Sequence, residues 1–132
     1  MRVHLLIGSL LAVTAFAIVA GVIAIGSPAA ARERRLDQRR VDDLVDIDMA
    51  IHDYQSKDHS LPGSLRDLQQ WSNRVVTLRD PSTQQSYEYR TIDSARYELC
   101  AVFQQPSRES ARHWMHGSGR QCFSRKATEG SE

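Results

Sequence analysis

The chain has 132 residues with 17 basic and 16 acidic side chains, which gives a formal net charge of +1. A chain without a strong positive field is a poor candidate for nucleic-acid binding, because that affinity comes largely from cationic contacts to phosphates. Arg2 is the one charged residue among the first 31, so the rest of the chain is also close to neutral and is long enough for one small domain.

An apolar segment near the N-terminus runs from Leu5 to Ile25 without a charge and reads LLIGSLLAVTAFAIVAGVIAI. As a helix it spans roughly 32 Å, which matches the hydrocarbon core of a bilayer. We predict a single-pass transmembrane helix over residues 5–25, after a short flank of residues 1–4. The alternative is a cleaved secretory signal, with Arg2 as its basic start and the small residues Ala29, Ala30 and Ala31 at the cleavage site. A retained signal-anchor is favoured because the apolar run is longer than that of a typical signal.

The carboxyl flank of this segment carries five arginines: Arg32, Arg34, Arg35, Arg39 and Arg40. Taken literally, the positive-inside rule places the following domain in the cytoplasm. Two cysteines favour an oxidising compartment instead. We therefore expect the anchor to lie in a bacterial inner membrane and the domain to be exported to the periplasm. The arginines either bind lipid headgroups or a partner, or form a solvated helix face beside the membrane, and the second interpretation is favoured.

Two helices are predicted after the anchor. Apolar residues three or four positions apart predict an amphipathic helix over about residues 30–56, continuing from the anchor: Val41, Leu44, Ile47, Ile51 and Tyr54. On this helix Arg39 lies one turn before Asp42 and Asp43 and is expected to pair with one of them. Ser64 and Asp67 have the spacing of a capping box, so a short helix should start at Ser64. Its neighbours Leu61, Leu65 and Leu68 are expected to pack on the apolar stripe.

Strand patterns dominate the C-terminal half. Asp80-Pro81 predicts a turn, after which residues 87–90 and 97–103 alternate in polarity and predict an antiparallel hairpin around Asp93-Ser94. A third strand is expected near residues 121–124. The predicted fold class is α+β, with the amphipathic helix packed on a small antiparallel sheet of about three strands. This domain should cover residues 26–125 and leave a flexible tail at 126–132.

Few residues suggest chemistry. Cys100 and Cys122 lie in or near predicted strands, so an exported domain is expected to join them in a disulfide, whereas a cytoplasmic one would keep two free thiols. His113 and His116 would complete a zinc site with these cysteines, but the spacing is not that of a known finger, and Trp114 and Met115 between them more plausibly pack on the sheet. Ser107, Ser110 and His113 are close in sequence without forming a catalytic motif. We expect no metal, no cofactor and no enzymatic activity.

Several segments, in order, resemble pilin-like proteins: the anchor, the amphipathic helix, LPGSLRDL, DPSTQQSYEYR and YELCAVF. The likeness is to the soluble part of type II secretion pseudopilins and to similar uncharacterised bacterial single-pass membrane proteins. It implies a long N-terminal helix, half in the membrane and half packed on a small sheet outside the cytoplasm. The loop that corresponds to Asp80-Pro81 can bind calcium in pseudopilins, but residues 82–86 carry no acid here. No acidic residue precedes Glu33, so the prepilin processing motif is absent and filament assembly by that route is not expected.

The function expected from these patterns is that of a membrane-anchored, non-enzymatic structural or interaction protein with an exported pilin-like domain. Its expected partners are the lipid bilayer and a protein that the sequence does not identify. The alternative is a membrane-tethered regulatory or adaptor domain that faces the cytoplasm.

Overall fold

The computed structural model describes residues 2–25, 27–72, 75–107 and 113–127. The chain divides into two compact units, residues 1–33 and residues 34–132. Three helices precede three strands, and the α+β class is as predicted. The elements are α1 (Arg2–Ile25), α2 (Pro28–Asp58), α3 (Leu65–Trp71), β1 (Glu88–Thr91), β2 (Arg96–Phe103) and β3 (Gly119–Lys126).

Helix α1 contains the apolar segment and buries almost none of it. Among the described residues, one helical segment is long and apolar enough to cross a membrane, and its most apolar stretch is entirely unburied. Phe16, for example, is 76% exposed. The hydroxyl of Thr14 donates to the carbonyl of Leu10 at 2.8 Å, so this polar group is satisfied within the helix. The predicted helix is confirmed, and its side chains present an apolar surface.

Helix α2 is amphipathic and extends about two residues beyond the predicted range at each end. The predicted stripe is its buried face: Val41, Leu44, Ile47 and Ile51 are buried, and Tyr54 packs against them half-buried. The helix ends where His59 takes a left-handed conformation with φ 55° while its N–H donates to the carbonyl of Gln55 at 2.8 Å. Such a residue closes the last turn and redirects the chain.

The sheet is antiparallel with the order β1-β2-β3, so β2 is its central strand. The hairpin turn falls at the predicted place, where Asp93 Oδ1 accepts the N–H groups of Ala95 at 2.9 Å and Arg96 at 2.7 Å. Strand β3 is longer than predicted, because it pairs with the full length of β2. The ordered chain therefore reaches the buried Ala127, whose N–H donates to Ala95 at 2.9 Å, and the rest of the expected tail, 128–132, lies outside the described residues.

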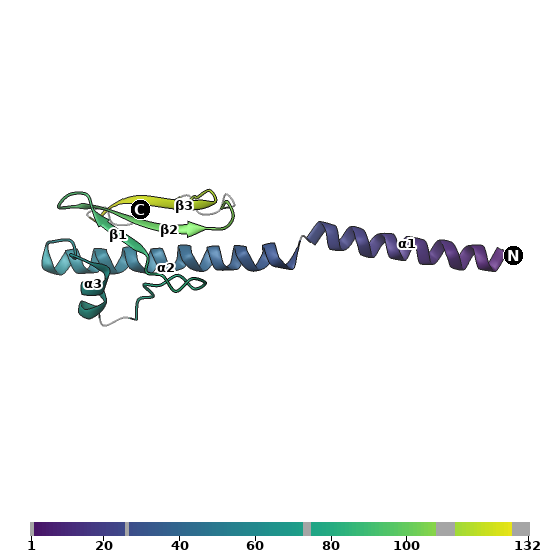
Figure 1. The fold of residues 1–132 in the computed structure, drawn as a ribbon, viewed down its shortest axis with the longest axis horizontal. Helices are drawn as coiled ribbons and strands as arrows, with labels where there is room; N and C mark the ends of the chain where they lie inside the picture. The colour runs from purple at the N-terminus through teal and green to yellow at the C-terminus, as the bar shows by residue number, and fades with distance from the viewer. Residues whose placement is uncertain (1, 26, 73–74, 108–112, 128–132) are drawn as a thin grey trace. The chain divides into compact units, whose positions relative to one another are not determined.

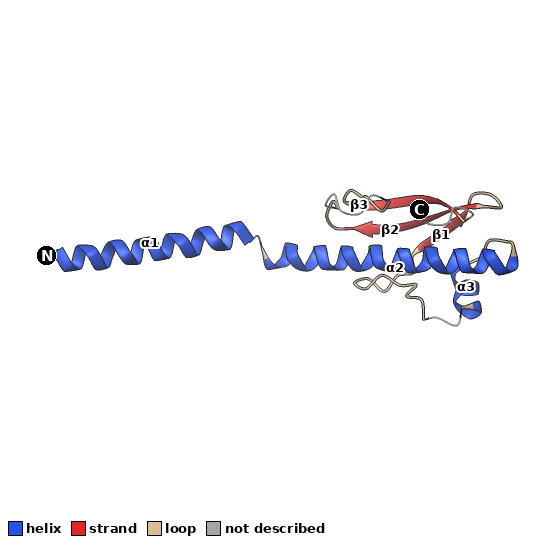
Figure 2. Ribbon diagram, turned by 180° about the vertical axis from the view of Figure 1, so that it is seen from behind, coloured by secondary structure: helices blue, strands red, loops and turns tan. Residues whose placement is uncertain are grey.

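The core of the domain lies between α2 and one face of the sheet. Figures 1 and 2 show α2 between the sheet on one side and α3 on the other. Alternate side chains of β2 point to the core, as period-2 patterning predicts: Tyr97, Leu99, Ala101 and Phe103. Leu65 and Leu68 of α3 join the same cluster and Leu61 packs against it, which confirms their predicted packing. The Ser64 hydroxyl accepts the N–H of Asp67 at 3.2 Å and so caps α3 as predicted.

The segment before β3 was expected to pack Trp114 and Met115 on the sheet. Trp114 does so: it is buried, and its ring centroid lies 4.9 Å from that of Phe123. Met115 is 58% exposed, so its half of the prediction is wrong. His116 covers the sheet instead, because its ring stacks on Phe103 at 3.6 Å.

Candidate functional site

A buried charge cluster joins α2 to the loop before β1. Arg40 is 1% exposed; it donates from Nη1 to Asp37 at 2.7 Å, from Nη2 to Asp80 at 3.1 Å, and from Nε to the second oxygen of Asp80. The carboxylate of Asp37 also accepts the N–H groups of Gln104 at 3.0 Å and Gln105 at 2.8 Å, just beyond β2. Arg40 was predicted to be a membrane-flanking basic residue, and this is wrong, because two carboxylates draw it into the interior of the domain.

Asp80 also organises the predicted turn. Its Oδ1 accepts the N–H groups of Ser82 and Thr83, both at 2.8 Å. Burial alone would raise the pKa of Asp80, but the hydrogen bonds from Arg40, Thr83 and Ser82 lower it to about 2. The carboxylate of this turn thus binds a guanidinium and two backbone N–H groups.

Two further carboxylates of α2 bind residues in or next to the sheet. Asp43 accepts the hydroxyl of Tyr87 at 2.7 Å, whereas Asp42 accepts from Gln38 at 3.0 Å, so these two acids have partners other than the predicted Arg39. Asp48 accepts the hydroxyl of Tyr97 and two N–H groups of Arg125, at 3.1 and 2.9 Å. Burial, together with the hydrogen bond to Asp48, raises the pKa of the Tyr97 hydroxyl.

Sequence reasoning missed this polar role of α2, although a pattern for it exists. Asp37 lies four residues before Val41 and Asp48 lies four residues after Leu44, so both acids fall on the buried stripe. A charge at such a position predicts a partner from another element, because unpaired buried charges are very costly. The pattern does not identify that partner.

The other four arginines of the flank remain on the surface: Arg32, Arg34, Arg35 and Arg39 are exposed. The last three belong to the same unit as the sheet and lie on the first turns of α2 in that unit. These exposed arginines follow the end of α1 closely in sequence. Their chemistry suits phosphate groups or carboxylates, which arginine binds through a planar fork of N–H donors.

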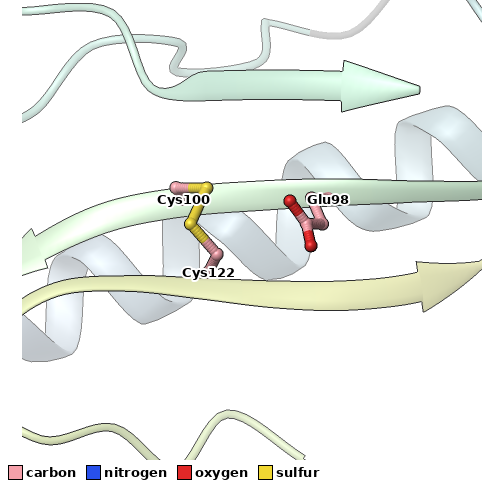
Figure 3. A group of neighbouring side chains, drawn as sticks. All are labelled: Glu98, Cys100 and Cys122. Atoms are coloured by element: carbon pink, nitrogen blue, oxygen red, sulfur yellow. A yellow bond between two sulfur atoms is a disulfide. The ribbon is translucent and has the colours of Figure 1, made fainter. Parts of the chain in front are cut away.

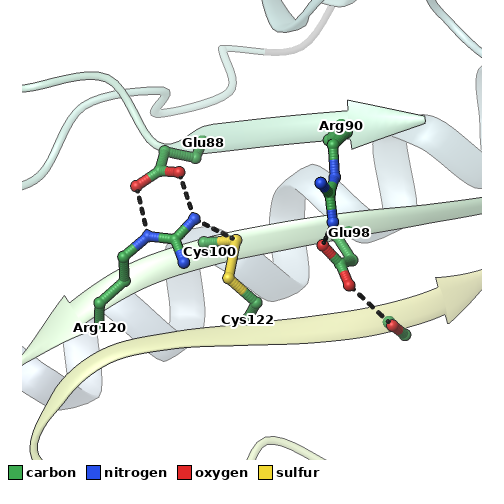
Figure 4. The surroundings of a disulfide bond; sticks show 7 residues. Glu88, Arg90, Glu98, Cys100, Arg120 and Cys122 are labelled. Atoms are coloured by element: carbon green, nitrogen blue, oxygen red, sulfur yellow. Dashed lines mark hydrogen bonds and ion pairs between the residues drawn. A yellow bond between two sulfur atoms is a disulfide. The ribbon is translucent and has the colours of Figure 1, made fainter. Parts of the chain in front are cut away.

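The outer face of the sheet carries the predicted disulfide between Cys100 and Cys122, which are directly paired on β2 and β3. Two ion pairs flank it, as Figure 4 shows: Arg120 binds Glu88 at 3.0 and 2.6 Å, and Arg90 binds Glu98 at 2.6 Å. Nη2 of Arg120 also donates to Sγ of Cys100 at 3.6 Å. These side chains line a solvent-open hollow of about 620 Å³ together with Tyr87 and Tyr89.

The zinc hypothesis required both cysteines as thiolates, and the disulfide removes them. Figure 3 shows Glu98 beside the two sulfurs, with the ligand atoms within 4.8 Å of one another, but sulfurs bonded to each other are not thiolate ligands. His113 is exposed, and His116 stacks on Phe103. The zinc hypothesis is wrong for the four residues considered.

The hydroxyl of Ser107 closes a loop rather than facing His113. Its Oγ donates to the carbonyl of His116 at 3.2 Å and accepts the N–H of the same residue at 3.0 Å. Ser110 lies outside the described residues. No hydrolytic geometry is assembled from the two members of the group that the structure describes.

Comparison of the sequence with protein-family models and with curated proteins gives no match, and comparison of the structure with solved structures gives none either. The likeness to pilins therefore rests on architecture: a long apolar N-terminal helix followed by a small three-stranded antiparallel sheet.

Proposed function

We propose that this chain is a membrane-anchored structural or interaction protein whose folded domain lies outside the cytoplasm, as in pilin-like proteins. The observation that carries the proposal is the exposed apolar surface of α1, which holds residues such as Leu10, Phe16 and Ile23 in contact with solvent when no lipid is present. Burying this surface in a bilayer removes it from water, at a gain of about 25 cal/mol for each Å². The bilayer is thus the first partner.

The exported orientation is supported by the disulfide, because disulfides persist mainly outside the reducing cytoplasm. A cytoplasmic regulatory or adaptor domain is the second candidate, and the exposed arginines favour it, since cationic flanks are retained on the cytoplasmic side. The two candidates differ in the location of one domain, which a topology experiment decides.

The test is a pair of C-terminal fusions expressed in a bacterial host, one to alkaline phosphatase and one to a fluorescent protein that matures only in the cytoplasm. We expect an active phosphatase and a dark fluorescent fusion. The opposite pattern contradicts the proposal and establishes the cytoplasmic candidate. A matched control replaces Val13 and Ile18 of α1 with arginine, which makes insertion costly and should leave the domain inside the cell.

Retention of the anchor needs a separate measurement, because a cleaved signal also exports the domain. The intact mass of the purified membrane-fraction protein should correspond to the whole chain, and the protein should stay in the membrane pellet after alkaline carbonate washing. An intact mass that corresponds to a polypeptide beginning near Ala31, together with recovery of the protein in the soluble fraction, contradicts anchoring.

A further inference from the structure

We propose that the Cys100–Cys122 disulfide is a site of thiol–disulfide exchange with low-molecular-weight thiols, entered at Cys122, with Cys100 as the leaving thiolate beside Arg120. The inference goes beyond the proposed function, because this exchange depends only on the folded domain. It does not depend on which side of the membrane the domain occupies. The disulfide lies on the outer face of the sheet, away from the core, and it lines the solvent-open hollow.

Access distinguishes the two sulfurs. Cys100 is 5% exposed on the central strand, whereas Cys122 lies on the edge strand β3 and is not buried. Exchange proceeds by attack of a thiolate on one sulfur of a disulfide, so the accessible sulfur is attacked and the other one leaves. Attack from solvent therefore adds the thiol to Cys122.

The charges around the sulfurs favour the same direction. The guanidinium of Arg120 donates to Sγ of Cys100 at 3.6 Å, and a cation beside a thiol stabilises its thiolate and makes it a better leaving group. Glu98 opposes this effect, but its carboxylate is bound by Arg90 at 2.6 Å and by Ser124 at 3.3 Å. Glu88 competes with the sulfur for Arg120.

The step balances as follows for a thiolate RS⁻. A bond forms between its sulfur and Sγ of Cys122, the Cys100–Cys122 bond breaks, and the electron pair of that bond leaves on Sγ of Cys100. A second RS⁻ then attacks the mixed disulfide and releases RSSR, so the two cysteines gain two electrons and two thiols are oxidised. In reverse, the thiolate of Cys100 attacks the adduct on Cys122 and expels RS⁻.

The fold of the domain is expected to persist when the disulfide is broken. The strands that bear the cysteines are paired along eight register positions, and the helix–sheet core lies on the opposite face. Neither cysteine belongs to the hydrophobic cluster between the helix and the sheet, so breaking the disulfide acts mainly by freeing the unfolded chain. The reduced and the thiol-bound forms are therefore expected to keep the fold.

The first test treats the full-length protein in detergent micelles with reduced glutathione, blocks free thiols with iodoacetamide and locates the adducts by peptide mass spectrometry. We expect glutathione on Cys122 and carbamidomethyl on Cys100. Glutathione mainly on Cys100 overturns the assigned direction. A disulfide that resists glutathione until urea unfolds the domain overturns the exchange site itself.

The second test separates the charge of Arg120 from the loss of its ion pair. Arg120→Gln and Glu88→Gln both break the Arg120–Glu88 pair, but the first removes the cation and the second frees it for the sulfur. We expect exchange about threefold slower in Arg120→Gln, since a leaving-group change of about one pKa unit alters the rate by that order, and no slower than wild type in Glu88→Gln. Arg66→Gln, on the exposed surface of α3, controls for net charge. Equal slowing in both variants, or none in Arg120→Gln, overturns the role of Arg120.

Discussion

Arg40 of α2 and Asp80 of the loop before β1 are forty residues apart in sequence and form a buried, two-pronged ion pair, which Asp37 completes on the other side of the guanidinium. The cluster is buried and holds both the turn at Asp80 and the chain beyond β2. One guanidinium serves two carboxylates, so loss of Arg40 leaves both acids without their cation.

Removing Arg40 should therefore destabilise the domain strongly. In Arg40→Met the carboxylates of Asp37 and Asp80 stay buried without their cation, and breaking such a pair costs about 3–5 kcal/mol. Urea unfolding, followed by the fluorescence of the two tryptophans, measures the free energy of unfolding. Arg39→Met is the matched control on the exposed face and should change it by less than about 0.5 kcal/mol. Equal losses in the two variants contradict the buried cluster.

Acid should weaken the domain through Asp80. Its pKa of about 2 in the folded state lies below the value of roughly 3.9 in an unfolded chain, so its stabilisation is present above about pH 4 and is lost as the pH falls toward 2. We expect Asp80→Asn to be less stable at pH 7 and to show a smaller decline in unfolding free energy between pH 4 and pH 2.

The control for this titration is Asp43→Asn. Burial raises the pKa of Asp43, so protonation of this group favours the folded state and acts in the opposite direction. The acid decline should persist in that variant. A decline that is the same in wild type, Asp43→Asn and Asp80→Asn would assign the acid sensitivity to other groups.

Loss of the disulfide should cost stability without abolishing the fold. Cys100 and Cys122 are 22 residues apart, and the entropy of closing such a loop corresponds to about 3 kcal/mol. The Cys100→Ser/Cys122→Ser variant should unfold at lower urea but keep the circular dichroism of the wild-type domain. A variant that is unfolded without urea would show that the helix–sheet core is insufficient by itself.

Truncating the buried stripe of α2 tests the core itself. Leu44→Ala removes a fully buried side chain and should cost about 2–5 kcal/mol, depending on how far the cavity collapses. Met49→Ala is the comparison on the same helix, where the side chain is 47% exposed, and it should have a much smaller effect. Thermal unfolding ranks the two, and a larger loss in Met49→Ala would contradict the assigned helix face.

The elements and their order were predictable from sequence, because each has a local pattern. The three- and four-residue spacing from Val41 to Tyr54, the Ser64 cap and the alternation in residues 97–103 each predict an element from neighbouring residues alone. The cystine was predicted because both cysteines fall in strand-like segments.

The charged contacts were not predictable in the same way. Local rules paired Arg39 with an acid one turn away and placed Arg40 at the membrane surface, whereas the partner of Arg40 is Asp80, which only the folded chain brings near. The contact between the guanidinium of Arg120 and Cys100 was unpredictable for the same reason, because it is created by the register of β2 and β3. Partners from distant segments are set by topology, and sequence spacing carries little information about them.

The carboxylates spaced along α2 determine where the helix stops against the sheet. An apolar stripe repeats every turn, so a slide by one turn, about 5.4 Å, would again bring apolar side chains against the sheet. Asp37, Asp43 and Asp48 each meet a different fixed partner, at Gln104, Tyr87 and Arg125. A helix displaced by one turn would lose all three contacts at once and would leave the buried carboxylates of Asp37 and Asp48 without these partners, so the three acids fix one register of the helix against the domain.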